Sequence, residues 1–348
     1  MLKPARLTLV SALLIALLPF TAAGWERTRA TTFATLPPGA AHPEGITADD
    51  AGRIYVTTFD VTKAGGPGQL FVFSPHGHLL RQVSVAGSSQ LLLDLAFHPT
   101  TGALLVIDFG NTRVLSVDPK TGVASVFATL PDLTPADPTA GPGPNVLTFD
   151  RLGNVYISDS FQGVIWRTGP GGGAPTAWLS SPLLTTPGVP PFGANGLAFN
   201  KAETALFVAN TGSDTVLKVP VKANGEADTP AVFANSINGA DGLILDEDDN
   251  VWVAANQADE IVVLDPTGRT IAKLGDFDGI GHDGAPNGLL FPASLVRKGH
   301  FIYVTNLALD LRLFNPAFVT GDSQWAAAVT QHTVSRIRAR LPRVPGLP

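Results

Sequence analysis

Six side chains that carry oxygen precede six apolar runs at nearly even spacing along the chain. The six residues are Glu44, Asp94, Asn145, Asn195, Asp241 and Asn287. Their carboxylate and carboxamide oxygens are the donors that a hard cation such as Ca²⁺ prefers. If the fold brings equivalent positions together, the pattern predicts a metal site. The competing interpretation is that Asp and Asn cap the starts of strands by bonding to nearby amides.

The six residues recur because the chain is built from a repeat of 46 to 51 residues. Each copy holds two alternating apolar runs joined by a polar turn, followed by two further runs, as in "GPNVLTFDRLGNVYISDS" from Gly143 onward. Four short strands in each of six copies predict an all-β, six-bladed β-propeller. The blades are expected to start near residues 44, 94, 145, 195, 241 and 287. The innermost strands of a propeller surround one axis, so the six side chains would converge there.

The two ends of the chain predict how the ring closes. The segment "ATTFATLP" (30–37) resembles "ASVFATLP" (124–131), which reads as a fourth strand. The last copy lacks such a strand after "TVSRIRAR". We therefore expect the N-terminal segment to add the outer strand of the last blade, which removes a free sheet edge. Residues 307–331 are expected to form an insertion between strands of blade six.

The first 23 residues have the pattern of a secretory signal peptide. Lys3 and Arg6 precede the apolar run "LTLVSALLIALLPF", and small residues precede Gly24. This pattern predicts cleavage near Gly24, a single domain over 24–348 and an exported protein, periplasmic or secreted. An uncleaved anchor is the alternative interpretation. The sequence has no cysteine, so disulfides and thiol chemistry are excluded.

The charge balance limits the class of partner. The chain has 29 acidic and 23 basic residues, and two of the bases lie in the predicted signal peptide. An acidic protein is a poor match for nucleic acid or for an anionic membrane surface. The prediction is a monomer that acts on a small molecule.

Four of the motifs resemble those of a known family. The sequence is similar to the gluconolactonase-like superfamily, with the luciferin-regenerating and senescence-marker proteins, and more distantly to diisopropyl fluorophosphatase and paraoxonase. The resemblance covers roughly residues 30–340. In that family a Glu, two Asn and an Asp from blades one, three, four and five hold the metal, which implies the same role for Glu44, Asn145, Asn195 and Asp241. They stand in "HPEG", "GPNV", "GANG" and "GADG", and Val146 after Asn145 is a departure from the pattern.

The resemblance also implies a reaction class. It implies a metal-dependent hydrolase of the lactonase or arylesterase type, with Ca²⁺ favoured and Mg²⁺ or Mn²⁺ left open, acting on a small lactone or ester at the channel mouth. Asp241 would be a base or nucleophile, and Asp94 and Asn287 would support the ligands or contact the substrate. His282, on the loop that leads to blade six, is a candidate proton shuttle or an exposed loop residue.

The loops over 131–144 and 180–194 predict a stiff, apolar entrance to the channel that includes Phe192. A different function remains open, because one fold hosts many functions. The alternative is a non-enzymatic, secreted propeller of the NHL-repeat kind that acts as a binding module.

Overall fold

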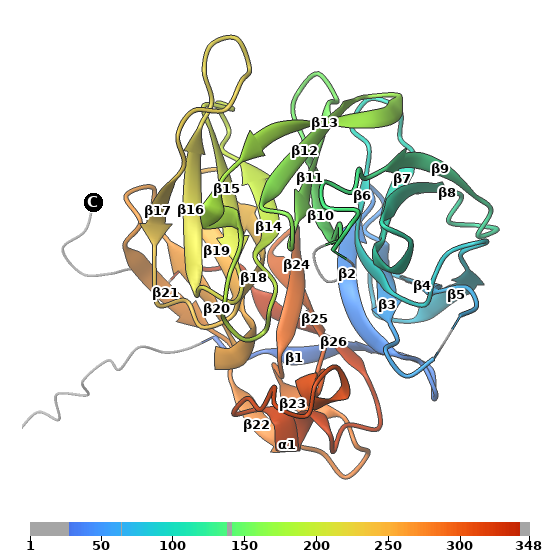
Figure 1. Ribbon diagram of the computed structural model, residues 1–348. Coiled ribbons are helices and arrows are strands. Elements are labelled where there is room, and N and C mark those ends of the chain that lie inside the picture. The colour runs from blue at the N-terminus through green and yellow to red at the C-terminus, as the bar shows by residue number, and fades with distance from the viewer. Residues whose placement is uncertain (1–27, 64, 138–140, 342–348) are drawn as a thin grey trace, which may run out of the picture.

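A computed structural model describes residues 28–63, 65–137 and 141–341 of the chain. Residues 1–23, for which a signal peptide is predicted, lie outside the described residues. The described chain forms six four-stranded antiparallel sheets, arranged as blades around a central axis, and a two-stranded sheet (Figure 1). The predicted six-bladed propeller is confirmed.

The strands of blades one to five follow chain order within each sheet. Blade one holds β2 (His42–Ala48), β3 (Ile54–Phe59), β4 (Gln69–Phe73) and β5 (Leu79–Ser84). Blade two holds β6 (Leu92–Phe97), β7 (Leu104–Asp108), β8 (Arg113–Val117) and β9 (Ala124–Thr129). Blade three holds β10 (Pro144–Phe149), β11 (Val155–Asp159), β12 (Val164–Gly169) and β13 (Gly172–Ser180). Blade four holds β14 (Ala194–Phe199), β15 (Ala205–Asn210), β16 (Thr215–Pro220) and β17 (Ala231–Ala234). Blade five holds β18 (Ala240–Leu245), β19 (Val251–Ala255), β20 (Glu260–Leu264) and β21 (Thr270–Leu274).

The last blade confirms the predicted closure. It consists of β24 (Pro292–Lys298), β25 (Phe301–Asn306), β26 (Thr333–Arg338) and the N-terminal strand β1 (Thr31–Thr35). Strand β1 pairs with β26 in antiparallel register, from Thr31 opposite Arg336 to Thr35 opposite Thr333. The chain therefore joins its two ends within one sheet, and the outer edge of β26 is covered.

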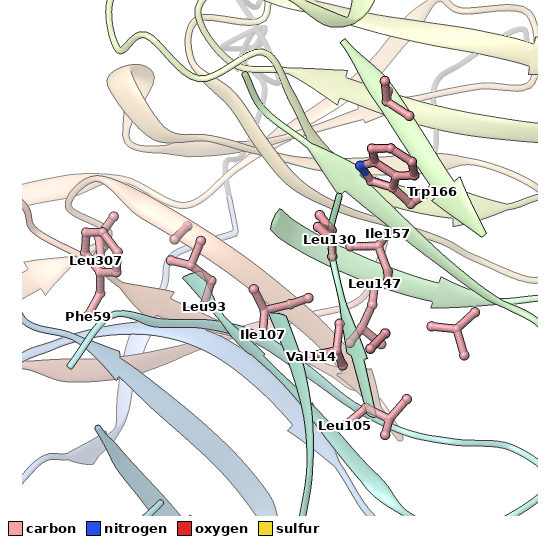
Figure 2. Close-up of a cluster of buried hydrophobic side chains, with 14 of the residues drawn as sticks. Phe59, Leu93, Leu105, Ile107, Val114, Leu130, Leu147, Ile157, Trp166 and Leu307 are labelled. Atoms are coloured by element: carbon pink, nitrogen blue, oxygen red, sulfur yellow. The ribbon is translucent and has the colours of Figure 1, made fainter. Parts of the chain in front are cut away.

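The hydrophobic core lies between the blades. Each of six buried clusters spans neighbouring blades, and the innermost strands touch in the closed order β2, β6, β10, β14, β18, β24 and back to β2. Figure 2 shows the cluster that spans blades two and three, with Leu147 between Leu105 and Trp166, and that extends to Phe59 and Leu307. Each sheet is therefore buried on both faces, which fits its nearly continuous apolar strands.

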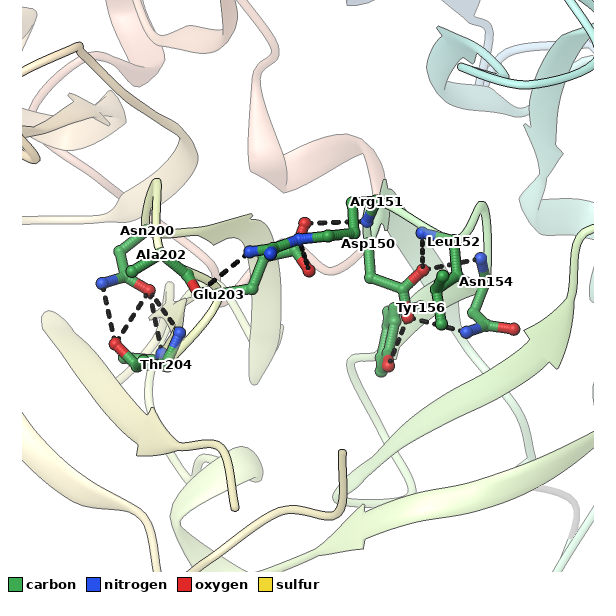
Figure 3. A network of polar contacts seen from close by, with 10 residues as sticks. Asp150, Arg151, Leu152, Asn154, Tyr156, Asn200, Ala202, Glu203 and Thr204 are labelled. Atoms are coloured by element: carbon green, nitrogen blue, oxygen red, sulfur yellow. Dashed lines mark hydrogen bonds and ion pairs between the residues drawn. The ribbon is translucent and has the colours of Figure 1, made fainter. Parts of the chain in front are cut away.

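Polar contacts also join the blades at the turns where the innermost strands end. Figure 3 shows one such link between blades three and four. The Arg151 guanidinium lies 2.9 Å from the Glu203 carboxylate, and the Arg151 amide donates to the same carboxylate at 2.7 Å. Within blade three, Asp150 accepts a hydrogen bond from the hydroxyl of Tyr156 in β11. These contacts fix the end of the propeller that lies away from the predicted ligands.

Each innermost strand is irregular near its start, and this irregularity corrects the predicted alignment. In every blade the pairing of the first two strands shifts over three residues, as between Pro144 and Leu147. The equivalent residues inside these bulges are Glu44, Leu93, Asn145, Asn195, Asp241 and Ala293. The expected alignment is therefore wrong in blade two by one residue, at Asp94, and in blade six by six residues, at Asn287. Four of the six equivalent positions are polar, and two are apolar.

The predicted insertion of blade six is confirmed between β25 and β26. It contains the short helices η4 (Leu311–Leu313) and α1 (Ser323–Ala326). It packs on the hairpin of β22 (Phe277–Ile280) and β23 (Pro286–Gly288), beside which α1 lies in Figure 1. The rings of Phe277 and Trp325 are 5.5 Å apart. Within the described residues, the helices are all too short or too polar to cross a membrane.

Candidate metal centre

Four polar side chains from four innermost strands line one cavity at the start of these strands. They are Glu44, Asn145, Asn195 and Asp241, from β2, β10, β14 and β18. Their exposed fractions lie between 3% and 5%. Each has a buried oxygen without a hydrogen-bond partner, namely Glu44 Oε2, Asn145 Oδ1, Asn195 Oδ1 and Asp241 Oδ1. The structure thus brings together the four residues whose types match the family pattern.

Hydrogen bonds with the cavity wall decide which atom remains free on three of these side chains. Asn145 donates its Nδ2 hydrogen to Ser160 Oγ at 3.1 Å, and Asn195 donates to Thr211 Oγ1 at 3.0 Å. Each amide therefore directs its nitrogen to the wall and leaves its oxygen unpartnered. On Asp241, Oδ2 accepts from Asn256 Nδ2 at 3.0 Å, which leaves Oδ1 free.

These three wall residues were missed by the sequence analysis. Ser160, Thr211 and Asn256 each follow the second strand of their blade, 15 or 16 residues after the side chain that they hold. This nearly constant offset is the signal that would have found them. Asn256 Oδ1 is also unpartnered, but it lies beside Gly239, where a Cβ would come within 1.8 Å of it. Gly239 thus leaves space for the amide that orients Asp241.

The electrostatics of the cavity favour a cation. Burial raises the pKa of Asp241 to about 7, against hydrogen bonds that lower it. Burial, with the charges of Asp241 and Asp94 adding to it, raises the pKa of Glu44 well above its ordinary value. The described residues that line the cavity include no Lys or Arg. A divalent cation would supply the missing positive charge and stabilise both carboxylates.

The donor set fits a hard cation. Two carboxylates and two amide carbonyls are oxygen ligands of the kind that Ca²⁺ and Mg²⁺ take. A search of the described residues for groups of three or more His, Cys, Asp or Glu side chains would not find this site, because two of its four donors are asparagines. No such group occurs among the described residues. The absence of sulfur and imidazole donors from the cavity disfavours zinc.

The remaining predicted site residues lie outside the cavity lining. Asp94 follows the equivalent position Leu93, and its carboxylate accepts the Leu147 amide at 3.0 Å across to blade three. Burial raises the pKa of Asp94 to about 7. Asn287 is exposed in β23, and His282 is exposed at the tip of the same hairpin. A supporting role for Asp94 has a structural basis, whereas the role of His282 stays a prediction that its position does not favour.

A second set of polar residues holds the loops around the mouth. Asp108, Asp159, Asn210 and Asn306 end the second strands of their blades. Asp159 accepts from the Gly143 amide and from the Trp166 indole, and Asn210 donates to the carbonyls of Leu183 and Thr185. Each of these residues hydrogen-bonds to the segment that leads into its own blade.

Comparison with known proteins gives consistent results. The SMP-30/Gluconolactonase/LRE-like region matches residues 111–275, which include Asn145, Asn195 and Asp241. The lactonase drp35 of Staphylococcus aureus is 27% identical over 137 residues, which cover 37% of this chain. The match spans 40% of the length of that lactonase.

Two solved structures share the architecture. Regucalcin, a calcium-binding protein of Agrobacterium tumefaciens, superposes with a TM-score of 0.59 at 18% identity and covers 92% of this chain and 99% of its own. A gluconolactonase of Xanthomonas campestris gives 0.58 at 15% identity, with 91% and 95% covered. Identities this low show the fold alone. The family match over 111–275, which is less than half of the chain, and the four residue types in register make this chain similar to the gluconolactonase-like family, and its fold is a six-bladed propeller.

Proposed function

We propose that the protein is a hydrolase of the lactonase or arylesterase type that depends on a divalent cation, with Ca²⁺ favoured, and that acts on a small lactone or ester at the channel mouth. The observation that carries this proposal is the set of four buried, unpartnered oxygens that line one cavity. The similarity to lactonase drp35 supports the reaction class. The shared fold with a calcium-binding regucalcin agrees with the choice of metal.

Glu44, Asn145, Asn195 and Asp241 would hold the cation. When bound, it would polarise the carbonyl of the ester and stabilise the negative charge that develops on its oxygen. Asp241 would also act as the general base, because Asn256 fixes one of its oxygens and leaves the other without a hydrogen-bond partner in the cavity. Without a cation, burial raises the pKa of Asp241 to about 7, and a bound cation would lower it, so that the carboxylate is ionised and able to accept a proton at neutral pH.

Asp241 would accept a proton from the water that attacks the acyl carbon. The bond between the water oxygen and that carbon forms, and the bond from the carbon to the leaving oxygen breaks. The leaving oxygen then takes the proton from Asp241, which returns to its carboxylate form. The apolar remainder of the cavity wall limits the water that reaches the reacting atoms.

The test compares Asp241→Asn with Asn195→Asp. Asp241→Asn keeps the side-chain shape but removes a charge and the base, so bound metal should fall and turnover should fall by at least about a hundredfold. Added Ca²⁺ should not restore that turnover. Asn195→Asp adds a charge, so it should keep the metal while it lowers turnover. Bound metal and hydrolysis of a lactone and aryl-ester panel are measured in parallel, with and without chelator.

Three results would change the proposal. Full turnover in Asp241→Asn would remove this residue from the mechanism. Unchanged metal content in the double variant Glu44→Gln/Asp241→Asn would reject the site. Stoichiometric metal without hydrolysis of any substrate in the panel would favour the non-enzymatic binding module.

We also propose that the protein is exported and that the mature chain begins near Gly24. The support is the charge and apolar pattern of residues 1–23, which lie outside the described residues. N-terminal sequencing of exported protein should find Gly24 or a close neighbour first. A chain that still starts at Met1 would contradict this.

A further inference from the structure

Five phenylalanine rings form a closed circuit at the mouth of the cavity. We call these residues the phenylalanine cage: Phe59, Phe109, Phe161, Phe192 and Phe314. Taken in that order and back to Phe59, neighbouring ring centres are 5.9, 5.9, 5.5, 6.4 and 6.0 Å apart. Aromatic rings at these separations attract one another. The cage draws its members from blades one to three, from the loop before blade four and from the insertion of blade six.

The cage stands next to the four unpartnered oxygens. Phe59, Phe192 and Phe314 line the same cavity as Glu44 and Asp241. Most of the remaining wall is apolar and comes from Leu93, Pro190, Phe291, Leu307, Leu309 and Leu311. Beyond the four predicted ligands, the described polar residues of the wall are Thr211 and Asn256, which already hold Asn195 and Asp241.

This wall discriminates against hydroxyl-rich substrates. A hydroxyl that enters the cavity loses its water and meets mostly carbon, because the cation would occupy the four proposed ligand oxygens. Among the described wall residues, this leaves Asn256 Oδ1 as the other buried side-chain oxygen without a partner. Each unpaired hydroxyl should weaken binding by about tenfold or more. An aryl or alkyl group instead gains contact with the rings and leaves water.

The cage must open to admit a substrate. It leaves about 40 Å³ of space that water could occupy, which is room for a few water molecules at most. Phe59 is 3% exposed and belongs to the buried core, whereas Phe314 is 41% exposed and follows the three-residue helix η4. Phe192 follows Pro190 and Pro191, which stiffen its loop. Phe314 is therefore the member with most freedom to move.

We propose that the substrate is a lactone or ester that carries an aryl or short alkyl group, and that this group replaces the Phe314 ring within the phenylalanine cage. The proposal rests on the hydrolase function above and adds the substrate class. It makes Phe314 a specificity-determining residue that sets the size of the accepted group.

The test uses δ-lactones with the same ring and different substituents, assayed with saturating Ca²⁺. The protein should prefer a hexyl- or phenyl-substituted lactone to a polyhydroxylated one by at least a hundredfold in kcat/KM. Phe314→Ala should shift the preferred substituent to a larger group. Trp325→Ala is the matched control, because this residue is similarly exposed on the same insertion, packs on Phe277 and does not line the cavity. It should leave the preference unchanged.

Binding of the corresponding lactams, which resist hydrolysis, separates this proposal from the reaction itself. If metal binds but no lactone is hydrolysed, the hydrolase function fails, and tighter binding of the hexyl lactam than of the polyhydroxylated lactam would still support the cage. Equal use or binding of both classes would overturn the proposal. An identical size preference in Phe314→Ala and Trp325→Ala, with both variants folded by circular dichroism, would also overturn it.

Discussion

Hydrogen bonds in the cavity wall leave one oxygen free on each of three proposed metal ligands. Asn145 and Asn195 are donors themselves, and Asn256 gives its hydrogen to the other oxygen of Asp241. A buried polar atom without a partner costs about 1–3 kcal/mol of folding free energy. Four such atoms in one cavity are a large burden for a fold of ordinary stability. A bound cation would remove that burden, which is why this cluster points to a ligand.

Thr211 offers a test of how the wall orients the amide. Thr211→Val keeps the shape of the side chain but removes the oxygen that accepts from Asn195 Nδ2. The Asn195 amide then loses its preferred direction, so metal affinity should fall by about 10- to 100-fold, as for other outer hydrogen bonds of metal sites. Isothermal titration with Ca²⁺ measures the change.

Thr211→Ser is the control for this variant, because it keeps the hydroxyl and should keep most of the affinity. Ser160→Ala should weaken binding through Asn145 in the same way. Ca²⁺ affinity in Thr211→Val equal to that of the wild type would show that Asn195 is not a ligand or needs no orientation.

The four polar positions that line the cavity were predictable from the sequence, whereas the equivalent positions in blades two and six were not. Glu44, Asn145, Asn195 and Asp241 each stand out as the polar residue before an apolar run. In blade two the run "LLLDLAF" (91–97) offers three leucines before the acid, and the bulge in the strand breaks the alternation that would fix the register. Sequence alone therefore placed Asp94 where the fold places Leu93.

At the scale of the strands, the same irregularity explains the error in blade six. The hairpin of β22 and β23 carries "APNGLLF", which imitates the start of an innermost strand. The actual strand starts with "PASLV" and has Ala293 at the equivalent position. The period of the repeat does not distinguish the two segments, because Asn287 and Ala293 lie only six residues apart and both are close to the expected spacing from Asp241.

A repeated contact between blades holds the outer strands in place, including β1. The turn between the third and fourth strands of blades one, two and three places a glycine against a carbonyl of the outer strand before it. A Cβ at Gly77 would lie 2.0 Å from the Phe33 carbonyl oxygen, and those at Gly122 and Gly172 would lie 2.1 and 2.2 Å from Ser84 and Phe127. Strand β1 thus occupies the place of an ordinary fourth strand.

Gly77→Ala should therefore destabilise the protein through β1. The φ angle of Gly77 is +82°, and the added methyl group would collide with Phe33. We expect a loss of about 2–4 kcal/mol in the free energy of unfolding, from strain in the turn and from displacement of β1. Deletion of residues 29–37 should be more severe, because it removes β1 and exposes the edge of β26. Thermal melting measures both effects.

Gly39→Ala separates the two contributions in Gly77→Ala. Gly39 has a φ of +79° and no atom within 4 Å of an added Cβ, so this variant carries the backbone strain alone. Equal losses in the two variants would show that the contact with β1 adds nothing. A deletion that melts within a degree or two of the intact protein would mean that β1 does not contribute to the ring.

At the scale of the whole molecule, apolar interfaces between blades must supply the stability. The sequence has no cysteine, so no disulfide contributes. The number of blades, the four-stranded sheets and the closure by the N-terminal segment followed from the repeat. The docking of the insertion on the hairpin could not be predicted from the repeat. It depends on single contacts such as that of Phe277 with Trp325, which no periodic pattern encodes.

The insertion also brings one acid close to another. Asp259 lies in the turn after β19, where its carboxylate accepts the Phe291 amide at 2.7 Å. Burial raises the pKa of Asp259 to about 7, and the charge of Asp322 in the insertion adds to this. Burial also raises the pKa of Asp322, to about 6, and one of its oxygens is buried without a partner. The two acids thus oppose the docking of the insertion once both are ionised.

The sign of the resulting pH dependence follows from linkage. An unfolded Asp ionises near pH 4, whereas Asp259 in the folded protein holds its proton up to about pH 7. Below pH 4 both states are protonated and the group has no effect on stability. As the pH rises from 4 through 7, the unfolded state gains from ionisation that the folded state resists, so the free energy of unfolding falls.

Asp259→Asn should therefore raise the melting temperature at pH 8 by a few degrees and have its smallest effect near pH 4. The amide keeps an oxygen for the Phe291 amide and carries no charge. Asp259 has a φ of +52°, a conformation that Asn tolerates well, so part of any gain has a backbone origin. Asp214→Asn reports that part, because Asp214 has a φ of +56° in the corresponding turn of blade four and accepts the Gly239 amide at 2.7 Å. After subtraction of the Asp214→Asn effect at each pH, the gain from Asp259→Asn should grow between pH 4 and pH 8. A gain that stays constant over this range would show that the Asp259 carboxylate does not oppose folding.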